Sequence, residues 1–283
     1  MDKKSKIELE QQAIKQYLLP FLNLSKIYPL LPGAKDSKGE AGFIGIDENE
    51  MKKLRLAYVE EAQTAADELL KDDAILEQID KLPFKNGDHI IAIGDSMTDD
   101  LRGWFEMLKY VVETARPELE LTWSNEAVHE DTSVDALKRL NRSVMHNKPN
   151  WVFVMLGSYD AMRYHAAPDR TLVSLAEYWE NMNSIENAVD QVTKNPIVWI
   201  SPAPVITELM ADNALFEGVI ENLDLSQFRE CYQGRKGIVI DPHGKRMGTP
   251  PEAWNYLPDG FYPSIAGHLA TTKAVLLGLL NDK

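Results

Sequence analysis

After Pro83 the sequence alternates short apolar runs with longer stretches of helical periodicity, and this alternation constrains the fold more than any other feature. Strands that alternate with helices form parallel sheets, because each helix carries the chain back to the same end of the sheet. We therefore expect helices on both faces of the sheet and ligands at the carboxyl ends of the strands. Five strands are predicted, at His89–Ile93, Leu119–Trp123, Trp151–Leu156, Ile197–Ile200 and Gly237–Ile240.

Helical periodicity fills the intervals between these strands and continues to the end of the domain. The segment Asp241–Pro258 contains several Pro and Gly residues, and we interpret it as a long loop at the carboxyl end of the sheet. The predicted helices are Asp99–Ala115, Ser133–His146, Thr171–Thr193, a less regular stretch before Gly234, and Ser264–Leu280.

The N-terminal part of the chain has a different pattern. From Asp47, an N-cap residue with Glu50 three positions later, apolar residues recur at helical spacing and predict an amphipathic helix. The apolar segment Ile14–Leu31 is interrupted by prolines, which favours a short helix followed by an extended arm. We therefore predict an N-terminal helical extension, residues 1–84, that packs on a main domain of residues 85–283. The extension could instead form a homodimer contact.

Composition excludes some classes of partner and site. The 283 residues are 44% hydrophobic, enough to bury one large core, and the net charge of −14 argues against a nucleic-acid partner. Cys231 is the only cysteine, so no cysteine-based metal site can form, and we expect neither a metal nor a cofactor. The first residues lack the pattern of a signal peptide, and the apolar runs are too short for a membrane span. A cytoplasmic protein is expected.

The first predicted strand ends in Gly94, Asp95 and Ser96, at a strand-to-helix turn. A serine there presents its hydroxyl at the mouth of the sheet, near the positive end of the next helix, which favours a developing oxyanion. The alternative is structural, because Asp and Ser are also common N-cap residues.

Three further segments follow predicted strands in an order that resembles the GDSL (SGNH) ester-hydrolase family, and the similarity covers roughly residues 88–281. The resemblance implies a three-layer α/β/α, flavodoxin-like fold with a five-stranded parallel sheet. The segments are SNEAVHEDTSVDAL, VMLGSYDAMR and LPDGFYPSIAGHLATTKAVL.

Two functional positions of the family are kept and three are replaced. The resemblance assigns the nucleophile to Ser96 and the acid that orients the catalytic histidine to Asp259, but Tyr262 stands at the histidine position. Glu130 and Tyr159 occupy the positions of a glycine and an asparagine that contribute to the family's oxyanion hole. A tyrosine with a pKa of about 10 is a poor base. We expect the Tyr262 hydroxyl to donate a hydrogen bond to Asp259 and the Tyr159 hydroxyl to serve as an oxyanion donor.

Another histidine could supply the base. His268 lies in the last family segment, and we assign it to the catalytic set with Ser96 and Asp259. His129 and His165 lie on the loops after the second and third strands and border the same site. Glu130, beside His129, could supply a carboxylate partner for a rebuilt pair.

The sequence leaves two functions open. The first is a GDSL-type, lipase-like serine esterase with a nonstandard base, acting on a small or medium acyl or acetyl ester or an acylated carbohydrate. The second is a catalytically inactive SGNH-fold binding or scaffold protein, whose pocket is closed by the three replacements. A flavodoxin-like nucleotide binder is disfavoured, since the chain has no glycine-rich phosphate loop.

Overall fold

A five-stranded parallel sheet forms the centre of the protein, as predicted. The computed structural model describes residues 13–211, 213, 216–242, 248 and 250–281. The strands are arranged in the order β2-β1-β3-β5-β7, and all neighbouring pairs are parallel. Their bounds are β1 His89–Gly94, β2 Thr122–Asn125, β3 Trp151–Met155, β5 Val198–Ile200 and β7 Ile238–Ile240.

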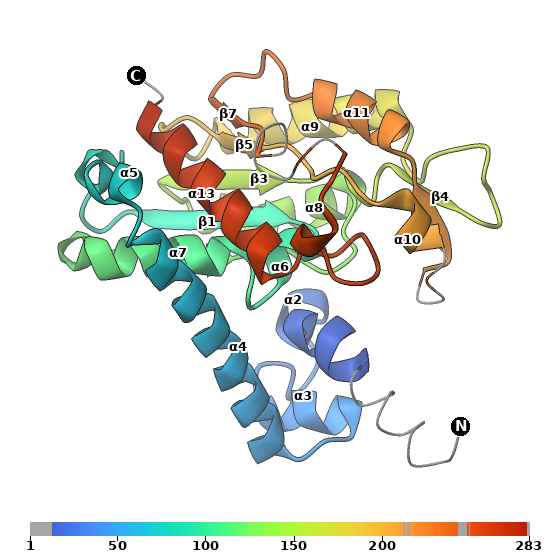
Figure 1. Cartoon of the computed structure of the whole chain (residues 1–283), viewed down its shortest axis with the longest axis horizontal. Helices are drawn as coiled ribbons and strands as arrows, with labels where there is room; N and C mark the ends of the chain where they lie inside the picture. Colours follow the sequence, from blue (N-terminus) through green and yellow to red (C-terminus); the bar gives the residue numbers. More distant parts are fainter. Residues whose placement is uncertain (1–12, 212, 214–215, 243–247, 249, 282–283) are drawn as a thin grey trace.

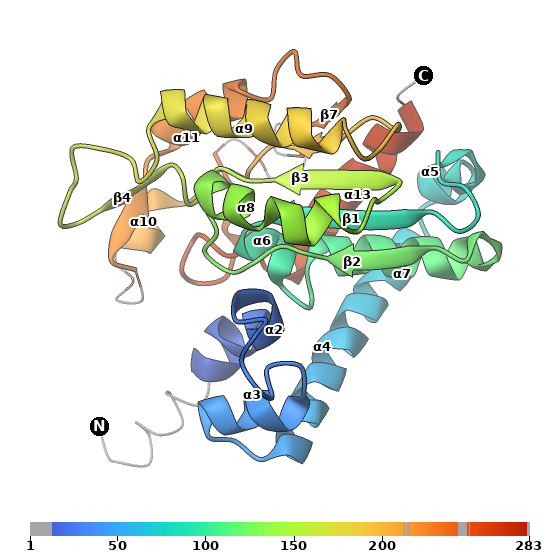
Figure 2. The same ribbon diagram turned by 180° about the vertical axis from the view of Figure 1, so that it is seen from behind.

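Helices cover both faces of this sheet, which confirms the three-layer α/β/α fold (Figures 1 and 2). One face carries α7 (Trp104–Ala115) and α13 (Ile265–Asn281). The other carries α8 (Ser133–Leu140), α9 (Leu175–Val189) and α11 (Asn222–Glu230). None of the helices in the described part of the chain is long and apolar enough to cross a bilayer.

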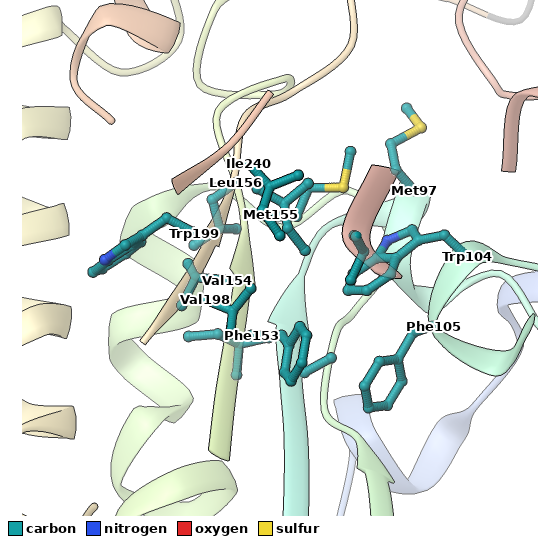
Figure 3. Close-up of a cluster of buried hydrophobic side chains, with 14 of the residues drawn as sticks. Met97, Trp104, Phe105, Phe153, Val154, Met155, Leu156, Val198, Trp199 and Ile240 are labelled. Carbon is teal, nitrogen blue, oxygen red and sulfur yellow. The ribbon is translucent and has the colours of Figure 1, made fainter. Parts of the chain in front are cut away.

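Aromatic side chains join the sheet to both helical layers (Figure 3). On one side, Trp104 and Phe105 of α7 pack on Phe153 of β3, with ring centroids 6.2 and 6.1 Å apart. On the other side, Trp199 of β5 packs edge-on against Tyr232, which follows α11. This burial fixes the strands whose carboxyl ends carry the candidate site.

Two predicted boundaries are wrong for local reasons. The strand expected from Leu119 begins at Thr122, because a 3-10 turn, η3 (Pro117–Leu119), precedes it and Glu120 takes a left-handed φ of 46°. The helix expected from Asp99 begins at Trp104, after the N-cap Gly103. Asp99 instead ends a separate short helix, α6 (Ser96–Asp99).

Several short elements were not predicted from the sequence. β4 (Met162–Tyr164) and β6 (Gly218–Ile220) form a separate antiparallel pair, next to α10 (Thr207–Ala211). The predicted loop Asp241–Pro258 contains a 3-10 turn, η5 (Ala253–Asn255), and its residues 243–247 and 249 lie outside the described part of the chain. The helix predicted over Ser133–His146 is α8 followed by a π-helical turn, η4, at Asn141–Met145.

The N-terminal extension contains the predicted amphipathic helix, α4 (Glu48–Leu69), which is capped by the Asp47 side chain. The predicted extended arm is wrong, because Asn23 accepts a hydrogen bond from the Lys26 amide and starts a further helical turn within Ile14–Leu31. The remaining elements are η1 (Leu19–Phe21), α2 (Leu24–Ile27), α3 (Ser37–Ile44), α5 (Asp73–Leu76) and η2 (Ile79–Lys81).

The two ends of α4 belong to different packing regions. Its first half joins a small core with the preceding helices, in which Leu19, Leu24 and Met51 are buried. Its second half packs on the main domain through Ala62 and Ala65, which contact Met107 of α7. The domain boundary at residue 84 therefore remains a prediction.

Candidate active site

Ser96 lies at the tight turn that joins β1 to α6. The turn leaves no space for a side chain at Gly94, where an added Cβ would lie 2.6 Å from Thr98 Oγ1. Asp95 is the N-cap, since its Oδ1 accepts a hydrogen bond from the Met97 amide at 3.0 Å. Because Asp95 performs the capping, the Ser96 hydroxyl is available for other contacts.

Three groups surround the Ser96 hydroxyl. Its Oγ lies 2.8 Å from His129 Nδ1 and 2.9 Å from the Tyr159 hydroxyl, and it accepts a hydrogen bond from the Glu130 amide at 3.0 Å. The structure therefore brings together Ser96, His129, Glu130 and Tyr159, all of which the sequence had placed near the site. Of the candidate histidines, His129 is the one that contacts the serine.

The loop after β2 holds the His129 imidazole in place from several directions. Its backbone amide donates to Asp99 Oδ2 at 2.9 Å. Its ring stacks on Phe21, with centroids 4.4 Å apart and planes 17° apart, and its centroid lies 6.1 Å from that of Tyr262, which also contacts Phe21. The ring is thus oriented by contacts that leave Nδ1 facing Ser96.

Glu130 adopts a left-handed backbone conformation, with φ at 62°. Residues other than glycine rarely occupy this region, whereas glycine enters it freely. This backbone conformation points the Glu130 amide at Ser96, and the carboxylate lies on a largely exposed side chain.

Burial sets the protonation state of His129. It lowers the pKa of the imidazole from its usual 6.5 to about 4, because the charged form loses hydration. The ring is therefore neutral at pH 7. A proton on Nε2, which lies 3.7 Å from Glu130 Oε1, leaves Nδ1 free to accept the Ser96 proton.

The two tyrosines extend the polar chain beyond the serine. The Tyr159 and Tyr262 hydroxyls lie 3.0 Å apart. Burial raises the pKa of both phenols, so both stay protonated and can donate hydrogen bonds. Tyr159 thus presents a protonated hydroxyl to Ser96.

Asp259 does not receive the predicted hydrogen bond from the Tyr262 hydroxyl. Its Oδ1 accepts instead from the backbone amides of Phe261 and Tyr262, each at 2.7 Å, and so stabilises the turn. Its Oδ2 is buried and makes no hydrogen bond within 3.5 Å among the described residues. The hydroxyl of Tyr17, a residue of the N-terminal extension, lies near Asp259. Burial and, to a smaller extent, the Asp259 carboxylate raise the pKa of this phenol.

The structure does not bring His268 or His165 to Ser96. His268 is buried on α13, where its Nε2 lies 3.7 Å from Asp100 Oδ2, and Asp100 also pairs with Arg102. In this position His268 contacts a core carboxylate rather than Ser96. His165 is exposed after β4, and its backbone amide donates to Glu217.

A known family model matches the part of the sequence that contains Ser96. The GDSL-like lipase/acylhydrolase family model covers residues 92–270, from the serine turn into α13. The chain belongs to this family. An acetylxylan esterase of Geobacillus stearothermophilus is 22% identical over 215 residues, which span 68% of this chain and 93% of that enzyme.

Two similar solved structures share the fold of the main domain. A catalytic mutant of the acetylxylan esterase Axe2 from Geobacillus stearothermophilus aligns with a TM-score of 0.58 and 20% identity, covering 69% of this chain and 95% of that one. LAE5, an alpha/beta hydrolase enzyme from the metagenome of Lake Arreo, aligns with a TM-score of 0.57 and 21% identity, covering 69% and 96%. At this identity the likeness concerns the fold.

The family pattern omits several residues that build the site in this chain. Tyr17, Phe21 and Lys26 come from the N-terminal extension, before the matched region. Lys26 pairs with Asp99, which in turn holds the His129 amide. The interrupted apolar pattern around Pro20 gave no signal for these long-range contacts. Among the described residues, no three His, Cys, Asp or Glu side chains gather to form a metal site.

Proposed function

We propose that this GDSL-family protein is a serine ester hydrolase in which His129, through Nδ1, is the general base for Ser96. The observation that carries this proposal is the 2.8 Å contact between Ser96 Oγ and His129 Nδ1. A serine hydroxyl becomes a useful nucleophile when a positioned base accepts its proton, and this contact has the length such a transfer needs.

The surrounding donors fit an acyl-transfer reaction. Nδ1 of His129 takes the Ser96 proton as Oγ attacks the ester carbonyl carbon, and the carbonyl oxygen becomes an oxyanion. The Glu130 amide and the Tyr159 hydroxyl, both within 3.0 Å of Oγ, can donate to that oxyanion. The imidazolium then protonates the leaving alcohol. Water attacks the acyl-serine by the same route and releases the acid and free Ser96.

The geometry predicts slow turnover. A base with a pKa of about 4 accepts a proton less readily than an ordinary histidine, because burial opposes the imidazolium. Glu130 Oε1 lies 3.7 Å from Nε2 on a largely exposed side chain, where solvent weakens its stabilisation of that charge. Asp259, which orients the base in the family, does not contact the His129 ring through any hydrogen bond in the described structure.

The proposed substrate is a small acyl or acetyl ester, including an acetylated carbohydrate. This choice follows the relatives, since an acetylxylan esterase matches in sequence and structures of an acetyl-xylooligosaccharide esterase match in fold. The negative charge of the chain is compatible with a neutral ester.

One observation favours the alternative of an inactive SGNH-fold binding or scaffold protein. Ser96 has 0% of its surface exposed, so no ester carbonyl can reach its hydroxyl in this conformation. Such a protein would keep the Ser96 contacts as structural hydrogen bonds.

Hydrolysis assays distinguish the two functions. We expect measurable turnover of nitrophenyl acetate and of acetylated xylooligosaccharides by the unaltered protein, and none by Ser96→Ala. His129→Gln should lose most of this activity, whereas the matched variant His268→Gln should keep it. Turnover that is absent from both the unaltered protein and Phe21→Ala, which lacks the ring stacked on His129, or that persists in Ser96→Ala, would exclude the proposed chemistry.

A further inference from the structure

The N-terminal extension closes the site that the main domain builds. We call residues 13–46 the N-terminal cover; it contains η1, α2 and α3. In Figures 1 and 2 these helices lie beside the sheet domain, and α4 connects them to it. The family match begins at residue 92, so the cover is an addition to the hydrolase domain.

Two aromatic rings of the cover lie against the site. Phe21 stacks on His129 and also contacts Tyr262, with ring centroids 5.4 Å apart. Tyr17 also contacts Tyr262, with ring centroids 5.9 Å apart. Since Ser96 is fully buried, these rings help to seal a hydroxyl that must meet an ester carbonyl.

The cover has a small core of its own. This core, including Leu19, Leu22 and Leu24, is a separate cluster from the main core, although Leu101 of the main domain packs against it and Phe21 belongs to the main core. A cavity of about 290 Å³, partly open to solvent, lies at this interface; it is lined by the cover, by Arg55 and Val59 of α4, and by main-domain residues that include Asp99. An interface with such a cavity makes fewer close contacts than a continuous core.

The polar contacts across this interface are few and reach the histidine. Lys26 pairs with Asp99 and donates to the Ala127 carbonyl at 2.9 Å. Asp99 also accepts the His129 amide. The Leu101 amide donates to the Pro20 carbonyl at 3.1 Å, and the Arg142 guanidinium donates to the Lys26 carbonyl at 2.8 Å. Movement of Lys26 would thus remove a cation that stabilises the carboxylate holding the His129 loop.

We propose that the N-terminal cover is an autoinhibitory lid, and that Ser96 becomes accessible only when Phe21 and Lys26 leave their places on the main domain. The inhibition of ester hydrolysis by the lid rests on the proposed function, whereas the opening of the lid does not depend on it. In the closed state the protein keeps a formed Ser96–His129 pair away from water and esters. In the open state the same pair meets its substrate.

A thiol placed at the serine measures opening without requiring catalysis. In a Cys231→Ala background, which removes the native thiol, we would introduce Ser96→Cys in the full chain and follow its alkylation by iodoacetamide with mass spectrometry. Phe21→Ala should raise the alkylation rate by about tenfold or more, because deletion of a buried phenyl ring usually costs more than one tenfold step in an equilibrium.

Two further variants separate lid opening from other effects. Lys26→Met removes the ion pair with Asp99. Because Lys26 contacts neither Ser96 nor its hydrogen-bond partners, this variant should also raise the alkylation rate. Phe43→Ala, on an exposed residue of the same cover, should change the rate by less than about twofold. Thermal unfolding of each variant establishes that the protein remains folded.

The possible outcomes decide between the two proposals. The lid would be overturned if the alkylation rates of Phe21→Ala and Lys26→Met stayed within twofold of the parent. It would also be overturned if Phe43→Ala raised the rate equally, or if the thiol at position 96 of the parent reacted as fast as a free cysteine. Faster alkylation without ester turnover by the corresponding Ser96 proteins would support the lid and reject the hydrolase. Turnover that both lid variants leave unchanged would support the hydrolase and reject the lid.

Discussion

The burial of His129 predicts an unusual pH dependence for the reaction of Ser96. The base must be neutral to accept a proton, so the rate should rise as pH passes upward through the pKa of the imidazole, which burial lowers to about 4. At pH 5, about 90% of such an imidazole is neutral, compared with about 3% of one that titrates at its ordinary value of 6.5. The rate at pH 5 should therefore be close to its value at pH 7.

The assay is the initial rate of nitrophenyl acetate hydrolysis between pH 3.5 and 8, with the blank rate of Ser96→Ala subtracted at each pH. Phe21→Ala provides a comparison, because removal of the stacked ring should hydrate His129 and move the midpoint of the profile toward 6.5. A midpoint between 6 and 7 in the unaltered protein would refute the argument from burial. A profile that His129→Gln leaves unchanged would refute the assignment of the base.

Three other variants test individual contacts. Glu130→Gly should stabilise the fold by up to about 1 kcal/mol in denaturant unfolding, because glycine fits the left-handed φ. The control Glu126→Gly, at a position without positive φ, should destabilise the fold. A stabilising Glu126→Gly and a destabilising Glu130→Gly would contradict this explanation. Tyr159→Phe should lower kcat about a hundredfold through loss of an oxyanion donor, and an unchanged kcat would remove Tyr159 from that role. His268→Gln should lower the free energy of unfolding by about 1–3 kcal/mol and leave turnover per folded molecule normal. Lost turnover with unchanged stability would show that His268 is catalytic.

The sheet could be predicted because its determinants are local. The runs around Ile91, Phe153 and Trp199 are apolar and short, and stretches of helical periodicity separate them. The positions of the parallel strands along the chain could therefore be predicted. The antiparallel pair β4 and β6 was missed because each strand has three residues and they pair across more than fifty residues of chain. Short strands of this kind depend on tertiary packing more than on propensity.

The site was predictable at the level of its loops but not of its contacts. The serine turn and the family positions placed Ser96, Glu130 and Tyr159 together, and the structure has their polar groups within 3.0 Å of the serine oxygen. Selection of His129 over His268 depends on ring orientation, which is set by a left-handed neighbour and by stacking on Phe21. A contact between residues more than a hundred positions apart leaves no periodic signal in one sequence.

Covalent labelling by a fluorophosphonate reports whether His129 activates Ser96. In the Phe21→Ala background, intact-mass and peptide analysis should find one adduct, on Ser96. His129→Gln should slow its formation by at least a hundredfold, while His268→Gln should leave the rate unchanged. Failure of Ser96 to label, or labelling at the same rate in His129→Gln, would contradict the assignment.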